Sequence, residues 1–188
     1  MTERQEGSPA PEQAPSAGER RSSIFDHRPP GLGGADQRQE GSESLPTIRV
    51  GGYLAVAGKL LMVQQRRADA RYWLLPGGGV RFGEPLAQAL VREVREELDL
   101  RVAVGPLLAI VESISPEPAY RKHVVHLIFD LSAAPEADPR PRDPDVLDAR
   151  FLDETEIAAA DVRPPIGDFL AACLRERPSS PQYLGRRW

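Results

Sequence analysis

Residues 78–100 read GGVRFGEPLAQALVREVREELDL, and this stretch decides the expected fold. A glycine-rich turn precedes a segment with helical periodicity, which carries Glu93, Glu96 and Glu97. At about 100° per residue, the three glutamates fall within an arc of roughly 100°. Carboxylates this close repel one another unless a cation lies between them, and oxygen-rich clusters suit Mg²⁺ or Mn²⁺. The stretch therefore predicts a metal-binding helix suited to phosphate chemistry.

The alternative interpretation of these glutamates is a solvated acidic helix face. Like charges four residues apart destabilise a helix by a few tenths of a kcal/mol, and Glu93 and Glu97 have this spacing. Because the acidic face also follows a glycine turn and accompanies Glu84 and Arg92, we favour the metal site.

The same stretch resembles the Nudix box of the Nudix hydrolases. That pattern is G, five residues, E, seven residues, then R-E-U-x-E-E-x-G-U, where U is aliphatic. Here Gly78 and Glu84 are followed by REVREELDL at residues 92–100, so that Asp99 alone departs from the pattern. A motif with this many fixed positions is more specific than a lone glycine motif. The resemblance implies an α/β fold in which a mixed sheet is sandwiched between helices.

The resemblance also implies the metal ligands. Carboxylates of Glu93, Glu96 and Glu97 would bind Mg²⁺, with Mn²⁺ as an alternative ion, and the backbone carbonyl of Gly78 would join them. Glycine lets the backbone approach metal and phosphate closely.

A general base is needed to take a proton from the attacking water. Members of the family differ in which glutamate does this. We predict Glu96 as the base and place Glu93 with it in the catalytic set. Glu112 and Glu117, which flank a later loop, are the candidates outside the box.

Glu84 and Arg92 occupy positions that tie the loop to the helix by an ion pair in this family. We expect a bidentate contact and a structural role at the site. Asp99 stands where a left-handed residue commonly ends the helix. Aspartate tolerates that conformation, but its charge opposes the helix dipole, so we expect a modest stability cost and an intact metal site.

Contacts to substrate are predicted from residues near the glycine loop. Arginines that could hold phosphates, or be plain surface, are Arg66, Arg67, Arg71 and Arg81. Of these we select Arg66 and Arg81, together with Tyr120 as an aromatic that could stack on a base.

Composition limits the function classes. The chain has 188 residues, of which 40% are hydrophobic and 28% charged, as expected for one globular domain and a tail. A net charge of −4 argues against a general nucleic-acid or membrane binder. No apolar run approaches the ~20 residues that a membrane span needs. Cys173 is the only cysteine, which excludes an intrachain disulfide and makes the cytoplasm the default compartment.

Three regions are expected along the chain. Residues 1–46, rich in Pro, Gln, Glu, Gly and Ser, predict a disordered tail, with a partner-binding arm as the alternative. Residues 47–178 form the predicted domain, and residues 179–188 a loose end.

Expected strands are 48–57, 60–66, 102–111 (broken by Gly105 and Pro106), 123–131 and 148–152, with a turn at residues 58–59. Expected helices are 85–98, 153–160 and 165–176. The apolar face of the first helix is predicted to consist of Ala87, Leu90, Val91, Val94 and Leu98.

These patterns favour a Mg²⁺-dependent hydrolase that cleaves the diphosphate linkage of a nucleoside diphosphate derivative, either an ADP-ribose-like compound or a nucleoside triphosphate. The alternative is a non-catalytic module of the same fold that senses a nucleotide. An isomerase of this fold would need metal-binding His and Cys residues, which have no useful spacing here.

The expected binding partner is a small nucleotide substrate. Many relatives dimerise, so the resemblance allows a homodimer, and loops 113–122 and 134–145 are expected to set the substrate.

Overall fold

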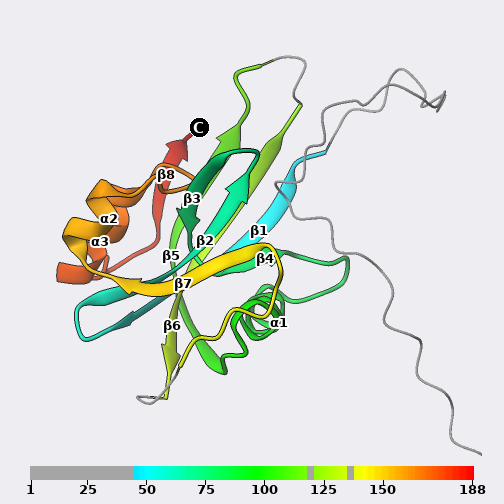
Figure 1. Cartoon of the computed structure of the whole chain (residues 1–188). Helices are drawn as coiled ribbons and strands as arrows, with labels where there is room; N and C mark the ends of the chain where they lie inside the picture. The colour runs from blue at the N-terminus through cyan, green and yellow to red at the C-terminus, as the bar shows by residue number, and fades with distance from the viewer. Residues whose placement is uncertain (1–44, 118–120, 135–137) are drawn as a thin grey trace, which may run out of the picture.

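The computed structural model describes residues 45–117, 121–134 and 138–188. Figure 1 shows a sheet with helices on both sides. The elements in chain order are β1 (Thr47–Val56), β2 (Lys59–Arg67), β3 (Ala70–Leu74), β4 (Gly77–Gly79), α1 (Leu86–Leu98), β5 (Val102–Ile114), β6 (His123–Ala133), β7 (Val146–Leu152), α2 (Glu154–Ala159), α3 (Gly167–Arg175) and β8 (Gln182–Arg186).

β1 lies at the centre of a mixed sheet with the order β3-β2-β1-β6-β5-β8. It pairs with β6 in parallel and with β2 and β4 in antiparallel orientation, while β7 pairs with β2. The predicted α/β architecture, a mixed sheet between helices, is therefore confirmed.

α1 covers one face of the sheet and α2 and α3 cover the other (Figure 1), and each face has its own apolar core. On one face, Leu90, Val94 and Leu98 of α1 pack in the same cluster as Val50 and Leu54 of β1. On the other, Leu170 of α3 and Ile157 of α2 pack with Tyr53, whose hydroxyl donates to the Leu170 carbonyl at 3.1 Å. Because successive residues of a strand face opposite ways, β1 contributes to both cores.

The β1–β2 hairpin forms as the sequence predicts, with its turn one residue earlier than expected. Ala57 and Gly58 are the turn residues, with φ of 50° and 75°. Lys59 already belongs to β2 and pairs with Val56. Positive φ at both central positions is the type I′ geometry, whose twist matches that of the flanking strands.

α1 begins at Leu86, and Pro85 stands at the N-cap with extended backbone, φ −61° and ψ 141°. The helix was expected to include Pro85. α1 ends at Leu98, and Asp99 at the C-cap adopts the predicted left-handed conformation with φ 54° and ψ 27°. The Asp99 side chain accepts a hydrogen bond from the Arg142 guanidinium at 2.6 Å, which partly offsets the unfavourable charge at this end of the helix.

The predicted apolar face of α1 is partly wrong. Ala87 and Val91 are exposed, whereas Ala89 is buried together with Leu90, Val94 and Leu98. The carboxylate-bearing Glu97 is also buried, with 6% of its surface exposed. The buried stripe is rotated from the expected one because α1 packs against both the sheet and the β4 loop.

Two predictions of irregular structure are also wrong. β5 runs without interruption through Gly105 and Pro106, and the irregularity appears as register shifts in its pairing with β6. The segment 179–188 is not loose, because β8 pairs in parallel with the edge of β5. Tyr183 donates its hydroxyl to Glu112 at 2.6 Å, and the Arg187 amide donates to the Glu112 carbonyl at 2.7 Å.

The predicted tail, residues 1–46, lies outside the described residues except for its last two positions. Within the described ranges, every helix is too short or too polar to cross a membrane.

Replacing Asp99 by glycine should change the free energy of unfolding by less than about 1 kcal/mol. Glycine would relieve the cost of the left-handed backbone at residue 99, but the substitution would also remove the exposed ion pair with Arg142. The two effects on stability oppose each other and have similar size. Thermal and urea melts measure the change, with Arg142→Gln as the control that removes the ion pair alone. A loss larger than about 2 kcal/mol would contradict this balance.

Candidate functional site

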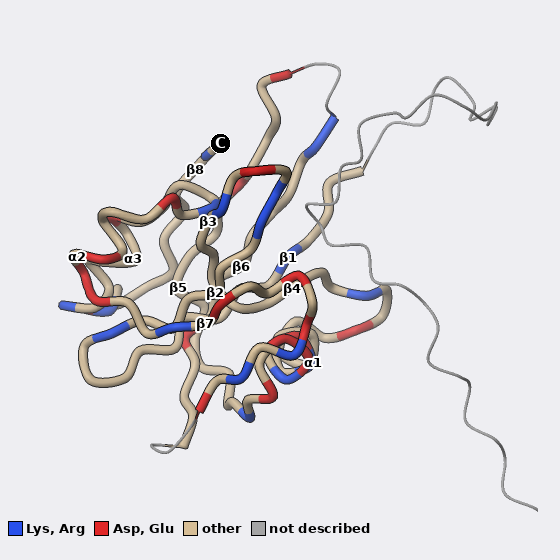
Figure 2. The backbone as a smooth tube through the Cα atoms, in the orientation of Figure 1, with Lys and Arg blue, Asp and Glu red and all other residues tan. Residues whose placement is uncertain are grey.

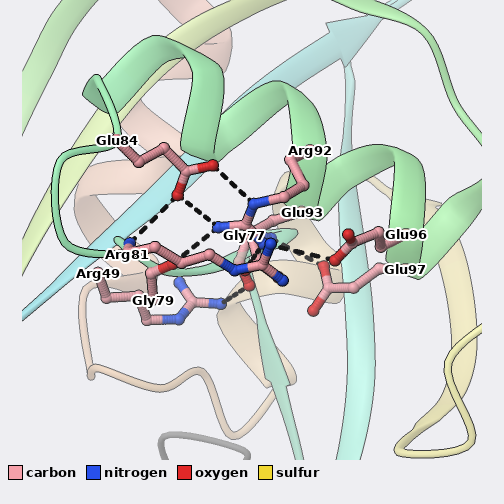
Figure 3. A network of polar contacts seen from close by, with 9 residues as sticks. All are labelled: Arg49, Gly77, Gly79, Arg81, Glu84, Arg92, Glu93, Glu96 and Glu97. Carbon is pink, nitrogen blue, oxygen red and sulfur yellow. Dashed lines mark hydrogen bonds and ion pairs between the residues drawn. The ribbon is translucent and has the colours of Figure 1, made fainter. Parts of the chain in front are cut away.

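The predicted site residues gather where α1 faces β4 (Figure 3). β4 is held against β1 by the antiparallel pairing of Gly77 with Gly51, Gly78 with Val50 and Gly79 with Arg49. α1 packs on the same part of the sheet through its apolar stripe. The sheet and the helix thus bring the glycine loop and the glutamates together.

Arg92 binds Glu84 through two parallel hydrogen bonds. Nε donates to Glu84 Oε1 and Nη2 to Oε2, each at 2.7 Å. The Arg81 amide donates to the same carboxylate at 3.1 Å, and Arg92 Nη2 also donates to the Gly79 carbonyl at 3.1 Å. The ion pair predicted from the sequence is present, and it ties the loop after β4 to the middle of α1.

Arg92 also contacts two of the predicted metal ligands. Its Nη1 donates to Glu93 Oε1 and lies 3.4 Å from Glu96 Oε2. The hydrogen bonds to Glu84 lower the pKa of that carboxyl group to about 2, and the same bonds raise the pKa of Arg92. One guanidinium therefore contacts three carboxylates and offsets part of their negative charge.

Glu97 is held in a different way, on the buried side of the helix. Its Oε2 accepts a hydrogen bond from the Gly77 amide at 2.8 Å. Burial raises its pKa to about 8, although Arg49 and the Gly77 amide act in the opposite direction. Arg49, itself only 5% exposed, donates to the carbonyls of Leu75 and Gly77 at 3.0 and 2.8 Å.

Two glycines let β4 lie close to both β1 and α1. Gly77 has φ of 137°, and a methyl group built on it would overlap the Val50 carbonyl. A methyl group on Gly78 would overlap the carboxyl group of Glu93. The Glu93 carboxylate thus lies directly against the Gly78 backbone.

The donor set fits a hard divalent cation. Glu93, Glu96 and Glu97 offer carboxylate oxygens on adjacent turns of one helix, and the space at Gly78 brings backbone next to one of them. Within the ranges described, however, no three His, Cys, Asp or Glu side chains form a ready metal-binding group. Since Glu93 and Glu96 both contact Arg92, they would have to turn from the guanidinium toward a cation.

The other predicted residues are spread more widely. Arg81 lies in the loop before α1 and joins the site through its amide. Arg66 is exposed on β2, opposite Arg71 of β3. Glu112 contacts Tyr183 and lies 3.4 Å from His123, at the β5 edge.

Two further candidates stand apart from the network in Figure 3. Glu117 is exposed, and its amide donates to the Ser115 hydroxyl at 3.1 Å. Tyr120 lies outside the described residues. Their predicted roles stay predictions.

Sequence reasoning missed Arg49, the buried partner of the glycine loop. The sequence carried a signal for this residue, because Arg49 lies inside the largely apolar strand TIRVGGYLAV. An arginine that is buried with such a strand needs a specific partner. Figure 2 shows basic and acidic segments close together around α1, and Figure 3 shows Arg49 and Arg92 among the glutamates.

A family model for the NUDIX domain matches residues 45–173, more than half of the chain. The chain belongs to the Nudix family. The match contains the whole sheet except β8, and also α1 and the glycine loop.

Curated relatives within the Nudix family are similar over part of their length. An ADP-ribose pyrophosphatase of Methanocaldococcus jannaschii is 33% identical over 87 residues, which are 46% of this chain and 50% of that protein. The nucleoside diphosphate-linked moiety X motif 6 protein of Xenopus laevis is 34% identical over 74 residues, 39% of this chain and 34% of that protein. The chain spans half or less of the length of these two relatives.

Solved Nudix structures share the fold. A NUDIX hydrolase from Nitrosomonas europaea superposes with a TM-score of 0.59 at 23% identity, covering 71% of this chain and 92% of that one. The likeness confirms the α/β Nudix fold that the box implied.

Alanine substitutions at Gly77 and Gly78 should have different consequences. Gly77→Ala should cost at least ~2 kcal/mol of stability, because both the backbone angle and a carbonyl oppose a side chain there. Gly78→Ala should fold, since the flexible Glu93 side chain can move, but should weaken Mn²⁺ binding at least ~tenfold. Thermal melts and calorimetric Mn²⁺ titration measure the two effects. Equal stability losses in both variants would contradict the assignment.

The Glu84–Arg92 pair should stabilise the fold only above acidic pH. The pKa of Glu84 falls from 4.5 to about 2 on folding, so its contribution is complete above pH 4.5 and disappears as the pH falls toward 2. Glu84→Gln should therefore be less stable than the wild type by about 1 kcal/mol at pH 7 and by progressively less below pH 4.5. Melting temperatures of both proteins across this range test the prediction, and a difference independent of pH would contradict it.

Proposed function

We propose that this chain is a divalent-cation-dependent hydrolase that cleaves the diphosphate linkage of a nucleoside diphosphate derivative. The supporting observation is the meeting of Glu93, Glu96 and Glu97 of α1 with the glycine loop of β4, in a chain of the Nudix family. The curated Methanocaldococcus relative, described as an ADP-ribose pyrophosphatase, supports the same reaction class.

Glu93, Glu96 and Glu97 are the proposed ligands of Mg²⁺, together with the Gly78 backbone carbonyl. A bound divalent cation neutralises phosphate oxygens and lowers the pKa of water. The chain itself keeps these ligands in place. Arg92 and Glu84 fix the loop relative to the helix, and the Gly77 amide holds Glu97. Mn²⁺ offers the same preference for oxygen ligands and is the natural alternative.

Glu96 is the proposed general base. Of the two helix glutamates that contact Arg92 besides Glu84, Glu96 has the longer contact, at 3.4 Å, and its side chain is 31% exposed against 14% for Glu93. A base must reach both water and solvent, so that it can accept a proton and release it. Glu93, next to the Gly78 backbone, is placed to position the reacting group.

The proposed substrates are ADP-ribose-like compounds and nucleoside triphosphates, both small and anionic. The two arginines of the site, Arg49 and Arg92, have different roles. Arg92 is engaged with carboxylates, while Arg49 lies behind the glycine loop and orients its carbonyls. Neither replaces the cation that must neutralise the substrate's phosphates, which is why the reaction is expected to require added metal.

Glu96→Gln and Glu97→Gln should each lower kcat by about 10²–10⁴-fold while the protein stays folded. The amide keeps the size of the side chain and removes the negative charge that binds metal or accepts a proton. Turnover is measured by chromatographic separation of the nucleotide products across nucleotide sugars, dinucleoside polyphosphates and nucleoside triphosphates, with Mg²⁺ and with Mn²⁺.

Glu176→Gln provides the matched control, because Glu176 is an exposed glutamate at the end of α3 and lies outside the site. Its activity should equal that of the wild type. Full activity in both box variants, or full wild-type activity after exhaustive chelation of divalent cations, would refute the proposal.

A further inference from the structure

A row of residues crosses the sheet from the glycine loop toward the interior. Gly79 of β4 pairs with Arg49 of β1, and Arg49 pairs with His126 of β6. Register partners on neighbouring strands point to the same face of a sheet, so the side chains of Arg49 and His126 are neighbours. Leu170 of α3 lines the same small cavity as both of them, so they lie on the face that α3 covers.

Both side chains of this pair are buried. Arg49 is 5% exposed and His126 is 2% exposed. Polar groups at this depth need hydrogen-bond partners, because they have given up their contacts with bulk water. The partners of the two side chains therefore indicate what the pair does.

The two ring nitrogens of His126 have different surroundings. Nε2 lies 3.1 Å from the hydroxyl oxygen of Ser113. Nδ1 is closed to solvent and has no hydrogen-bond partner within the described part of the chain. Burial, together with the charges of Arg49 and Lys122, lowers the pKa of His126 to about 3, so the ring is neutral at physiological pH. A neutral imidazole has one N–H donor and one acceptor nitrogen.

The hydrogen bonds of Arg49 to the loop both come from one nitrogen. Nη2 donates to the carbonyls of Leu75 and Gly77, at 3.0 and 2.8 Å. Figure 3 shows the guanidinium next to Gly77. A guanidinium carries five N–H donors and no acceptor, so the donors on Nε and Nη1 are left for other acceptors.

A cavity of about 10 Å³ is lined by both side chains, together with Gly51, Leu75 and Leu170 among others. This volume is close to the smallest that holds one water molecule, and it is far too small for a nucleotide. A buried water needs at least two polar partners. Arg49 and His126 supply them from two sides of the sheet pairing.

The donors and acceptors present determine how such a water is oriented. Arg49 can only donate, so the water accepts from the guanidinium and keeps its own two O–H groups. One of these is donated to Nδ1 of His126, which must then be the acceptor nitrogen of the ring. The ring proton is accordingly on Nε2 and is donated to Ser113.

We propose that the small cavity binds one water molecule, which joins Nδ1 of His126 to the Arg49 guanidinium, and that His126 thereby positions the glycine loop. The bridge keeps Nη2 of Arg49 on the carbonyls of Leu75 and Gly77. The Gly77 amide in turn holds Glu97, a proposed metal ligand. The positioning role rests on the proposed function, whereas the water site does not.

A crystal structure and NMR of the wild type test the water site without metal or substrate. The crystal structure should show one ordered water within hydrogen-bond distance of Nδ1 and of the guanidinium. With ¹⁵N-labelled histidine, two-bond ¹⁵N–¹H correlations between about pH 6 and 8 should show a neutral His126 ring with its proton on Nε2. His126→Asn identifies the signals by their loss. A dry cavity, or a proton on Nδ1, overturns the inference.

Metal affinity tests the positioning role. Calorimetric titration with Mn²⁺ measures it on the full chain without nucleotide. His126→Leu removes the acceptor nitrogen and should weaken Mn²⁺ binding about tenfold, as the loss of a group behind metal ligands commonly does. His126→Asn should recover most of the affinity, because its amide oxygen can occupy the place of Nδ1.

Ile128→Ala is the matched control. Ile128 is 2% exposed, lies two residues further along β6 and lines the same cavity. The substitution removes packing but no polar atom, so it should lower the melting temperature and leave the Mn²⁺ affinity within about twofold of the wild type. Equal losses of Mn²⁺ affinity in Ile128→Ala and His126→Leu, or wild-type affinity in His126→Leu, would refute the positioning role.

Turnover separates this inference from the proposed function. A wild type that holds the ordered water and loses Mn²⁺ affinity on His126→Leu substitution, but hydrolyses no nucleotide, supports the inference and refutes the hydrolase. Hydrolysis by the wild type, with kcat, KM and Mn²⁺ affinity all unchanged in His126→Leu, refutes the inference and leaves the hydrolase intact.

Discussion

The close approach of α1 to β4 is the constraint on which the site depends. Gly77 has no space for a side chain against the β1 backbone, Gly78 has none against Glu93 of α1, and the Glu97 carboxylate binds the Gly77 amide. The apolar stripe of α1 holds the helix on the sheet at this distance. A side chain at Gly77 would push β4 away from β1, and the glutamates would then lose their fixed relation to the loop backbone.

Two arginines make the accumulation of carboxylates tolerable. Arg92 lies among Glu84, Glu93 and Glu96, while Arg49 interacts from the interior with Glu97. Figure 3 shows that both guanidinium groups also contact backbone carbonyls of the loop. The same interactions therefore offset part of the charge of the four glutamates and also fix the loop. A divalent ion would compete with Arg92 for Glu93 and Glu96.

Arg49 connects the glycine loop with the interior of the protein. Its backbone belongs to β1, and its side chain donates to the Gly77 carbonyl and lines a small cavity together with His126 and Leu170. The carboxylates on α1 suit the proposed metal, since Mg²⁺ prefers oxygen ligands.

The sequence by itself determined the helix with its three glutamates, the Glu84–Arg92 pair, the left-handed Asp99 and the hairpin of β1 and β2. These features depend on neighbours along the chain or on a motif with many fixed positions. Tertiary structure alone decided that Glu97 is buried, that residues 182–186 form an edge strand, and that Arg49 and His126 line one cavity. Each of these depends on residues far apart in the chain, since a carboxylate is buried, or a short strand paired, only when a distant backbone supplies the hydrogen bonds.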